Sequence, residues 1–203
     1  MSSPLLSVSG LAGVAVPGCF GKTEGAPGVH LSERVGLGLA TVATHKGQGE
    51  GLKQKAREAY GVDLPDRSII VHGPAVSFVG IGPGQWLAVS ESLKHDALAC
   101  DLANQLKGLA SVSDQSDGRT VIRIGGPRAR DTLAKGLPID LDPRAFPKDG
   151  AATSVISLMG VQLWQVDDTP TYDIAVFRSL SGSFWRWLTT SAAEFDYEVT
   201  APR

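Results

Sequence analysis

Hydrophobic residues recur with a period of two over many short segments of this chain, which is the pattern of half-buried β-strands. The clearest example is the stretch 119–124, where Thr or Ile occupies every second position. Gly160 separates two further segments of this kind, 153–159 and 161–166. Alternation and β-branched runs also predict strands over residues 37–44, 68–72, 76–81, 86–90, 111–115, 172–178 and 197–199.

Four other segments carry apolar residues three or four positions apart, as amphipathic helices do. Glycines and a proline mark the ends of one of them, and a serine, which is a favourable N-cap residue, begins another. Helices are expected around Leu52, Ala56 and Tyr60; over 94–107; from Gly125-Gly126-Pro127 to Gly136; and from Ser181 through Phe184, Leu188, Ser191 and Phe195.

The order of these elements is β-α-β-β-α-β in each half of the chain, with one extra strand in the second half. This is the order of the ferredoxin-like motif, in which helices cover one face of a sheet. We therefore expect an α+β fold of two ferredoxin-like halves packed together, with an extended N-terminal arm. The expected limits are 1–30 for the arm, 31–116 for the first half and 117–203 for the second.

The predicted arm is apolar but shows no regular period. Residues 1–21 contain no charged side chain, and Gly and Pro residues disfavour a helix there. A solvated disordered tail is normally rich in charge, whereas burying one Leu or Phe side chain contributes about 1.5–3 kcal/mol. Because the elements from residue 37 onward complete both halves, we predict that the arm contacts another subunit. The candidate contact residues are Leu5, Leu6, Leu11 and Phe20.

Two tryptophans of the last predicted helix lie at opposite margins of its apolar stripe. Trp185 and Trp187 widen this stripe on both sides, while Arg186 lies behind it. One interpretation is a large core that takes up both rings. The alternative is a helix that presents part of its aromatic face to another subunit, because Trp is enriched at the centres of interfaces. Both tryptophans are therefore interface candidates as well as core candidates.

Composition and charge exclude several classes of function. The chain has 203 residues, 42% of them hydrophobic, and a net charge of −2 without any run of five basic residues. It therefore lacks the electrostatic footprint of a nucleic-acid-binding protein. The apolar stretch before Phe20 is shorter than the roughly 20 residues that a membrane helix needs, and no basic residue precedes it. We expect a cytoplasmic protein that does not bind a membrane.

Motifs for catalysis or cofactor binding are incomplete. Gly18 to Thr23 resembles the end of a phosphate-binding loop, but Val16 stands where the first glycine is required. The glycines of 80–84 precede a strand rather than the helix that a dinucleotide site needs. The four histidines share no metal-ligand spacing. We assign no catalytic, cofactor-binding or metal-binding residue.

One glycine-rich turn is open to two interpretations. Gly125-Gly126-Pro127-Arg128 joins a strand to a helix, and Arg130 follows in the first turn. Exposed backbone N–H groups together with arginines could hold an anion there. Arginines at this end of a helix oppose its dipole, however, so the alternative is tight strand-to-helix packing with solvated arginines.

Five segments carry the most specific signal in the chain. They are Val112-Ser113-Asp114-Gln115-Ser116-Asp117-Gly118-Arg119, Pro127-Arg128-Ala129-Arg130-Asp131, Leu141-Asp142-Pro143-Arg144-Ala145-Phe146, Tyr172-Asp173-Ile174-Ala175-Val176-Phe177-Arg178-Ser179 and Phe184-Trp185-Arg186-Trp187-Leu188. They resemble the gamma subunit family of heterotetrameric sarcosine oxidase. More loosely, Gly126, Pro127 and Ala129 after a strand are similar to the folate-binding half of the aminomethyltransferases of glycine cleavage.

The resemblance implies a role in an enzyme complex rather than an active site on this chain. The family's complex of alpha, beta, gamma and delta chains oxidises sarcosine to glycine and forms hydrogen peroxide. When tetrahydrofolate is present, the complex also forms 5,10-methylenetetrahydrofolate. FAD, covalent FMN, NAD and zinc are then expected on the other chains, and none on this one.

The expected function is therefore that of a non-catalytic gamma subunit whose partners are the alpha, beta and delta chains. The alternative is a stand-alone folate-binding or one-carbon transfer protein of the aminomethyltransferase type. That function would require a carboxylate held in a cleft, and the sequence alone does not identify one.

Overall fold

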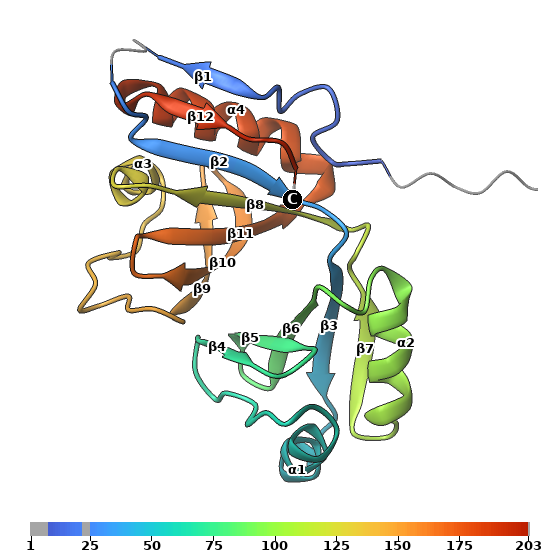
Figure 1. Cartoon of the computed structure of the whole chain (residues 1–203). Coiled ribbons are helices and arrows are strands. Elements are labelled where there is room, and N and C mark those ends of the chain that lie inside the picture. Colours follow the sequence, from blue (N-terminus) through green and yellow to red (C-terminus); the bar gives the residue numbers. More distant parts are fainter. Residues whose placement is uncertain (1–7, 22–24, 203) are drawn as a thin grey trace, which may run out of the picture.

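The computed structural model describes residues 8–21 and 25–202, and within them the chain forms two β-sheets with helices on their faces (Figure 1). All strand pairs are antiparallel except the parallel pair of β12 and β2. The fold is therefore mixed α+β, as the sequence predicts. The smaller sheet has the strand order β4-β5-β6-β3-β7, and the larger sheet has the order β1-β12-β2-β8-β11-β10-β9.

The strands of the smaller sheet are β3 (Gly38–Thr44), β4 (Ile70–His72), β5 (Ser77–Gly82), β6 (Gln85–Ser90) and β7 (Ala110–Asp114). Helices α1 (Gly49–Tyr60) and α2 (Asp96–Gln105) cover one face of this sheet. Their buried residues recur at helical spacing, so the predicted periodicity is the one that packs the core. The Tyr60 hydroxyl, at the end of α1, donates a hydrogen bond of 2.8 Å to Asp101 of α2.

The strands of the larger sheet are β1 (Gly18–Phe20), β2 (Val29–Arg34), β8 (Arg119–Gly125), β9 (Ala151–Ile156), β10 (Met159–Asp167), β11 (Thr171–Phe177) and β12 (Tyr197–Val199). Helices α3 (Ala129–Ala134) and α4 (Ser181–Ala192) pack on one face of it. Short 3-10 turns, η1 (Arg178–Leu180) and η2 (Ala193–Phe195), flank α4. Phe184 and Leu188 of α4 are fully buried against the sheet.

The helix-free faces of the two sheets meet each other in a third apolar cluster. Its members are Leu37, Leu39, Ile70, Val79 and Leu87 near or within the smaller sheet, and Val121, Ala151, Trp164 and Ala175 in the larger one. Backbone hydrogen bonds also join the halves, since Ile70 N–H donates to Asp149 and Ala151 N–H donates to Ser68. Each sheet is thus covered by helices on one face and by the other sheet on part of the second.

Strand β2 corrects the predicted domain limits. The sequence predicts an arm to residue 30 and a first half from residue 31, whereas β2 lies inside the larger sheet between β12 and β8 (Figure 1). Val29, Leu31, Ser32 and Glu33 are buried, as in a strand that lies inside a sheet. Two of these four residues are polar, so the sequence shows no clear hydrophobic alternation there. The described part of the chain therefore starts in the larger half, crosses to the smaller one and returns.

The described part of the arm lies against the chain's own larger half. Leu11 is 1% exposed and belongs to the core beneath α4. Strand β1 pairs with β12 at the edge of the larger sheet, and Phe20 stacks on Tyr197 with ring centroids 5.1 Å apart. The prediction that the arm lies along another subunit rather than along this chain is therefore wrong for Leu11 and for β1.

Two local predictions also need correction. Ser181 does not cap α4 with its side chain, because its hydroxyl donates to the carbonyl oxygens of Gly10 and Arg178. The turn between β9 and β10 lies at Ser157 and Leu158 rather than at Gly160, and both turn residues have positive φ angles. Glycine is the usual residue for that backbone conformation, so the sequence pattern placed the turn at Gly160 instead of at Ser157 and Leu158.

Candidate functional site

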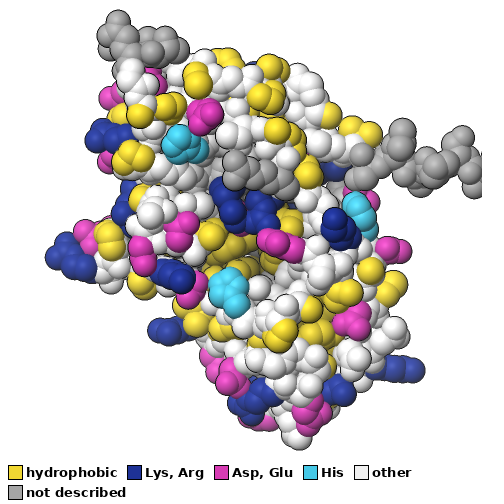
Figure 2. All heavy atoms as spheres, viewed as in Figure 1, with side chains coloured by type: hydrophobic (Ala, Val, Ile, Leu, Met, Phe, Trp, Pro, Cys, Tyr) yellow, Lys and Arg dark blue, Asp and Glu magenta, His cyan; other side chains and the backbone are white. Residues whose placement is uncertain are grey.

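A cleft of about 340 Å³ lies between the two halves and has both apolar and charged walls. Figure 2 shows it as a hollow with hydrophobic side chains inside, Lys and Arg side chains along the upper rim and a histidine below. Pockets of this size and mixed character are typical of ligand sites. We call it the inter-sheet cleft, and its lining includes Arg34, Ile70, His72, Ser77, Val89, Glu91, Arg123, Trp164, Val166 and Asp173.

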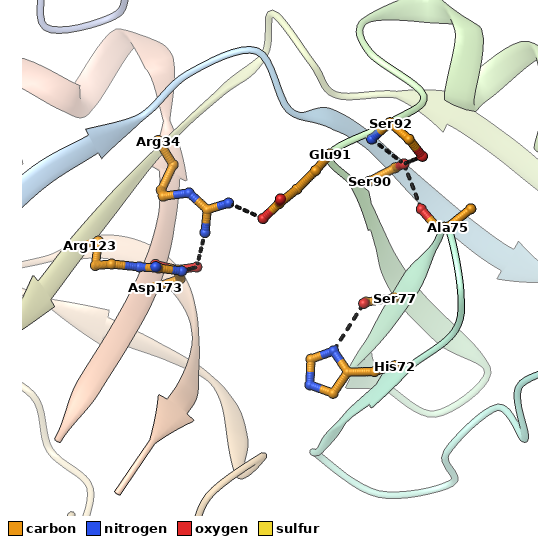
Figure 3. Close-up of polar contacts among 9 residues, drawn as sticks. All are labelled: Arg34, His72, Ala75, Ser77, Ser90, Glu91, Ser92, Arg123 and Asp173. Atoms are coloured by element: carbon orange, nitrogen blue, oxygen red, sulfur yellow. Dashed lines mark hydrogen bonds and ion pairs between the residues drawn. The ribbon is translucent and has the colours of Figure 1, made fainter. Parts of the chain in front are cut away.

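Three neighbouring strands of the larger sheet place an ion network on one wall of the inter-sheet cleft (Figure 3). Asp173 of β11 pairs in register with Arg123 of β8, and Arg34 lies at the end of the adjacent strand β2. Arg123 Nε donates to Asp173 Oδ1 at 2.7 Å and its Nη2 donates to Oδ2 at 2.8 Å. Arg34 Nη1 donates to Oδ2 at 2.9 Å. Two guanidinium groups therefore hold one carboxylate.

Much of this network is shielded from water. The Asp173 side chain is only 4% exposed and that of Arg34 is 12% exposed, so water replaces few of their contacts. The hydrogen bond to Asp173 raises the pKa of Arg123 above its ordinary value, against the opposing effect of burial. Both oxygens of Asp173 already accept guanidinium N–H groups, so the two arginines occupy this carboxylate.

The opposite wall of the cleft comes from the smaller half. Glu91 follows β6 and pairs with Arg34 across the gap between the halves, although its side chain is 78% exposed. His72 of β4 lies within hydrogen-bonding distance of Ser77 (3.1 Å) and of Asp149 (3.3 Å). Figure 3 shows Glu91 reaching toward Arg34 while His72 and Ser77 lie below them. Charged groups of both halves thus meet in the cleft.

A second surface hollow, of about 450 Å³, lies between the arm and α4. We call it the arm surface, and it is lined by Val14, Val16, Phe20, Gly182, Trp185, Arg186, Thr189, Tyr197 and Val199. Val14, Val16 and Phe20 are exposed large hydrophobic residues in the chain as it stands. The structure therefore brings Phe20 and Trp185, two of the predicted interface residues, to one hollow.

The other predicted interface residues have different positions. Leu5 and Leu6 lie outside the described residues, and Leu11 is a core residue of this chain, so its expected contact with a partner is corrected. Trp185 is 5% exposed and belongs to the core of the larger half, as one of the two interpretations expects. Trp187 is half-buried and packs at 5.8 Å from the ring of Phe184.

The glycine-rich turn after β8 is occupied by contacts within the chain. Gly126 has a φ of +105°, and an added Cβ would lie 2.7 Å from the Gly28 carbonyl oxygen, so the position requires glycine. Arg128 pairs with Asp131 and lies 4.4 Å over the ring of Phe195. Arg130 donates a 3.0 Å hydrogen bond to the Tyr172 hydroxyl. These contacts agree with tight packing as the role of the turn.

Sequence reasoning missed the residues of the ion network. The available signal was Asp173 itself, a carboxylate inside the otherwise apolar strand 172–177, where a charge needs a partner. Nothing local identified Arg34 and Arg123 as its partners. Within residues 8–21 and 25–202, no group of three or more His, Cys, Asp or Glu side chains is arranged to hold a metal ion. No helix of the described chain is long and apolar enough to span a membrane.

Comparison of the sequence with known protein families finds a match over most of the chain. Residues 50–194 match the family described as "Sarcosine oxidase, gamma subunit family". The sarcosine oxidase subunit gamma of Corynebacterium sp. (strain P-1) is 31% identical over 156 residues, which cover 75% of each chain.

Solved structures agree with the family match. A chain of the heterotetrameric sarcosine oxidase from Corynebacterium sp. U-96 superposes with a TM-score of 0.80 at 26% identity, covering 94% of this chain and 97% of that chain. The glycine cleavage aminomethyltransferase T from Bartonella henselae shares the fold, with a TM-score of 0.63 at 14% identity, covering 87% of this chain and 48% of that chain. The sequence match and the matching fold together show that the chain belongs to the sarcosine oxidase gamma subunit family.

Proposed function

We propose that this chain is a non-catalytic subunit of a cytoplasmic heterotetrameric sarcosine oxidase and assembles with alpha, beta and delta chains. The observation that carries the proposal is the superposition on a chain of such an oxidase over 94% of this chain and 97% of that one. In the assembled enzyme, sarcosine is oxidised to glycine with formation of hydrogen peroxide and 5,10-methylenetetrahydrofolate. FAD, FMN, NAD and zinc are bound by the other chains.

The state of the buried carboxylate supports a non-catalytic role. A folate-dependent one-carbon transferase requires a carboxylate in a cleft that is free to contact the pterin or a reacting nitrogen. Asp173 is the carboxylate that this cleft buries, and its oxygens are occupied by Arg34 and Arg123. The alternative, a stand-alone folate-binding or one-carbon transfer protein, is also supported only by a likeness of fold.

The arm surface supports an interface with another chain of the complex. Exposed apolar patches rimmed by polar residues often mark contacts between proteins. Phe20 is 37% exposed at the edge strand β1 and lines this surface. Trp187 lies outside it, half-buried on α4, and remains a separate proposed contact residue. Leu5 and Leu6 remain proposed contact residues that precede the described part of the arm.

The strand order also supports a finer description of the fold. Without the short edge strand β4, the smaller sheet has the order β7-β3-β6-β5, which agrees with a ferredoxin-like half. The larger sheet follows the same plan through β12, β8, β11 and β10, with β2 inserted between β12 and β8. We therefore propose two ferredoxin-like halves, the second of them interrupted by the N-terminal strand.

The proposal is tested by expressing a tagged form of this chain with and without the alpha, beta and delta chains. We expect a stable four-chain complex that carries flavin absorbance, and an isolated chain that is colourless and binds no tetrahydrofolate in calorimetry. Phe20→Ala and Trp187→Ala should weaken assembly, whereas Val155→Ala, at an exposed position of β9, should not. An isolated chain that binds one equivalent of tetrahydrofolate would instead favour the transferase alternative.

A further inference from the structure

The inter-sheet cleft contains an exposed carboxylate that pairs with an arginine of the opposite wall. Glu91 is the only acidic side chain that pairs with Arg34 from the smaller half among the described residues, and 78% of its side chain is exposed to solvent. Exposed ion pairs of this kind contribute about 0–1 kcal/mol, so the contact is easily exchanged. Arg34 itself is held in place from the other side by the buried Asp173.

The backbone at Glu91 is fixed although its side chain is exposed. Ser90 Oγ donates to the Ala75 carbonyl oxygen at 2.7 Å and accepts the Leu93 N–H at 2.9 Å, so the turn after β6 is tied down. Release of Arg34 therefore needs only a rotation of the Glu91 side chain. No movement of the two halves relative to each other is required.

Release of Glu91 changes the charge of the cleft. With Glu91 in place, the two arginines face two carboxylates and the lining is neutral apart from His72. Once Glu91 turns away, Arg34 and Arg123 share only Asp173, and one guanidinium edge of Arg34 is left without its partner. An anion with hydrogen-bond acceptors in one plane fits such an edge, because guanidinium groups bind carboxylates in this way.

The rest of the cleft is suited to the body of such a ligand. Ile70, Val89, Trp164 and Val166 supply an apolar wall, and the volume of about 340 Å³ accommodates a ring-sized molecule. Ser77 and His72 add polar groups on the side away from Arg34. These lining residues include no helix N-terminus, which is the common binding feature for a phosphate. A carboxylate on an apolar body matches both the arginine wall and the apolar wall.

We propose that the inter-sheet cleft is a binding site for a small carboxylate with an apolar or aromatic body, whose carboxylate replaces that of Glu91 on Arg34. Asp173 and Arg123 position Arg34, and Trp164 with its apolar neighbours receives the ligand's body. Glu91 acts as an internal competitor that occupies the site until a ligand displaces it.

The experiment uses the full, purified chain and benzoate as the probe, with benzamide as a neutral probe of the same shape. Titration of the ¹⁵N-labelled chain should give saturable shifts at the amides of Ser77 and Glu91 with benzoate, and not with benzamide. Glu91→Gln should tighten benzoate binding by about two- to fivefold, the equivalent of one exposed ion pair. Glu50→Gln removes the same charge from an exposed pair on α1 and should leave binding unchanged.

Arg34→Gln should weaken benzoate binding by about tenfold or more, since a charge-assisted hydrogen bond is lost. If Arg34→Gln does not fold, the comparison of Glu91→Gln with Glu50→Gln and of benzoate with benzamide decides the proposal. Equal binding of the two probes, no saturable binding to the wild-type chain, or weaker binding to Glu91→Gln would each overturn it.

Discussion

At the scale of single residues, the buried carboxylate of Asp173 serves two partners in the larger half. Asp173 lies on β11 and its side chain is 4% exposed, while the side chains of Arg34 and Arg123 are 12% and 32% exposed. A buried ion pair adds little compared with apolar packing, but the loss of one partner leaves uncompensated charge in a poorly solvated place. The two arginines therefore depend on this one carboxylate.

We expect Asp173→Ala to lower the free energy of unfolding by about 3–5 kcal/mol, because Arg34 and Arg123 lose their common partner. Urea unfolding followed by circular dichroism measures the change. Asp63→Ala is the matched control, since it breaks an ion pair with Arg57 whose two side chains are both exposed. That variant should lose no more than about 1 kcal/mol. Equal losses of unfolding free energy in the two variants would show that Asp173 stabilises the fold no more than an exposed ion pair does.

Tyr60 gives the stability of the smaller half a dependence on alkaline pH. Burial raises the pKa of its hydroxyl above the ordinary value of 10.0, and the hydrogen bond to Asp101 raises it further. Above pH 10 the unfolded chain therefore loses this proton while the folded chain still holds it. The free energy of unfolding must fall as the pH rises through this range.

We expect Tyr60→Phe to make this decline shallower. The measurement is the urea midpoint of the wild-type chain and of the variant at intervals between pH 8 and pH 11. Below pH 10 the two chains should differ by a constant amount, which reflects the lost hydrogen bond of about 1 kcal/mol. The expectation fails if both chains lose stability with the same slope above pH 10.

At the scale of elements, the N-terminal segment has two roles where the sequence predicts one. Its apolar residues suggest contact with a partner, and the structure divides them between the chain's own core and an exposed surface. Leu11 lies in the core beneath α4, whereas Val14 and Val16 remain exposed beside Phe20. One segment thus supplies both packing for this chain and an apolar surface for contact.

We expect Leu11→Ala to lower the free energy of unfolding by about 2–5 kcal/mol, since it removes a buried side chain. Val14→Ala, at a position 48% exposed, should stay within about 0.5 kcal/mol of the wild type. Deletion of residues 1–21 should likewise lower the melting temperature, because it removes both Leu11 and β1. A truncated chain with unchanged melting would restore the interpretation that the arm serves only a partner.

At the scale of the whole molecule, β2 joins the N-terminal part of the chain to strands of the C-terminal part. It pairs with β12 on one side and with β8 on the other, so the larger sheet is interrupted without it (Figure 1). Val29 and Leu31 are also buried in the core of that half. The larger half therefore cannot be built from the C-terminal part of the sequence alone.

We expect a fragment of residues 117–203 to lack cooperative unfolding, because β8 and β12 lose the strand between them. Joining residues 25–35 to this fragment through a flexible linker should restore a cooperative thermal transition in circular dichroism. The same linker carrying residues 68–78, which include β4 from the smaller sheet, serves as the control and should not restore it. A cooperative transition in the bare fragment would contradict the central place of β2.

The sequence by itself determined the mixed α+β class, most of the strands and helices, and the family. Periodicity found these elements because each buries one face, and burial repeats every two residues in a strand and every three to four in a helix. It placed Phe184 and Leu188 of α4 on the buried stripe for the same reason. Short segments without a full period, such as 29–34, gave a pattern that was too weak to predict a strand.

Only the tertiary structure decided which distant residues meet. Arg34, Arg123 and Asp173 come from strands far apart in sequence, and their contact depends on the strand order β2-β8-β11. The pairing of Arg34 with Glu91 depends in addition on how the two sheets pack. Hydrogen bonds and charges act over a few ångströms in space, and a linear pattern carries no information about such distances until the strand order is fixed.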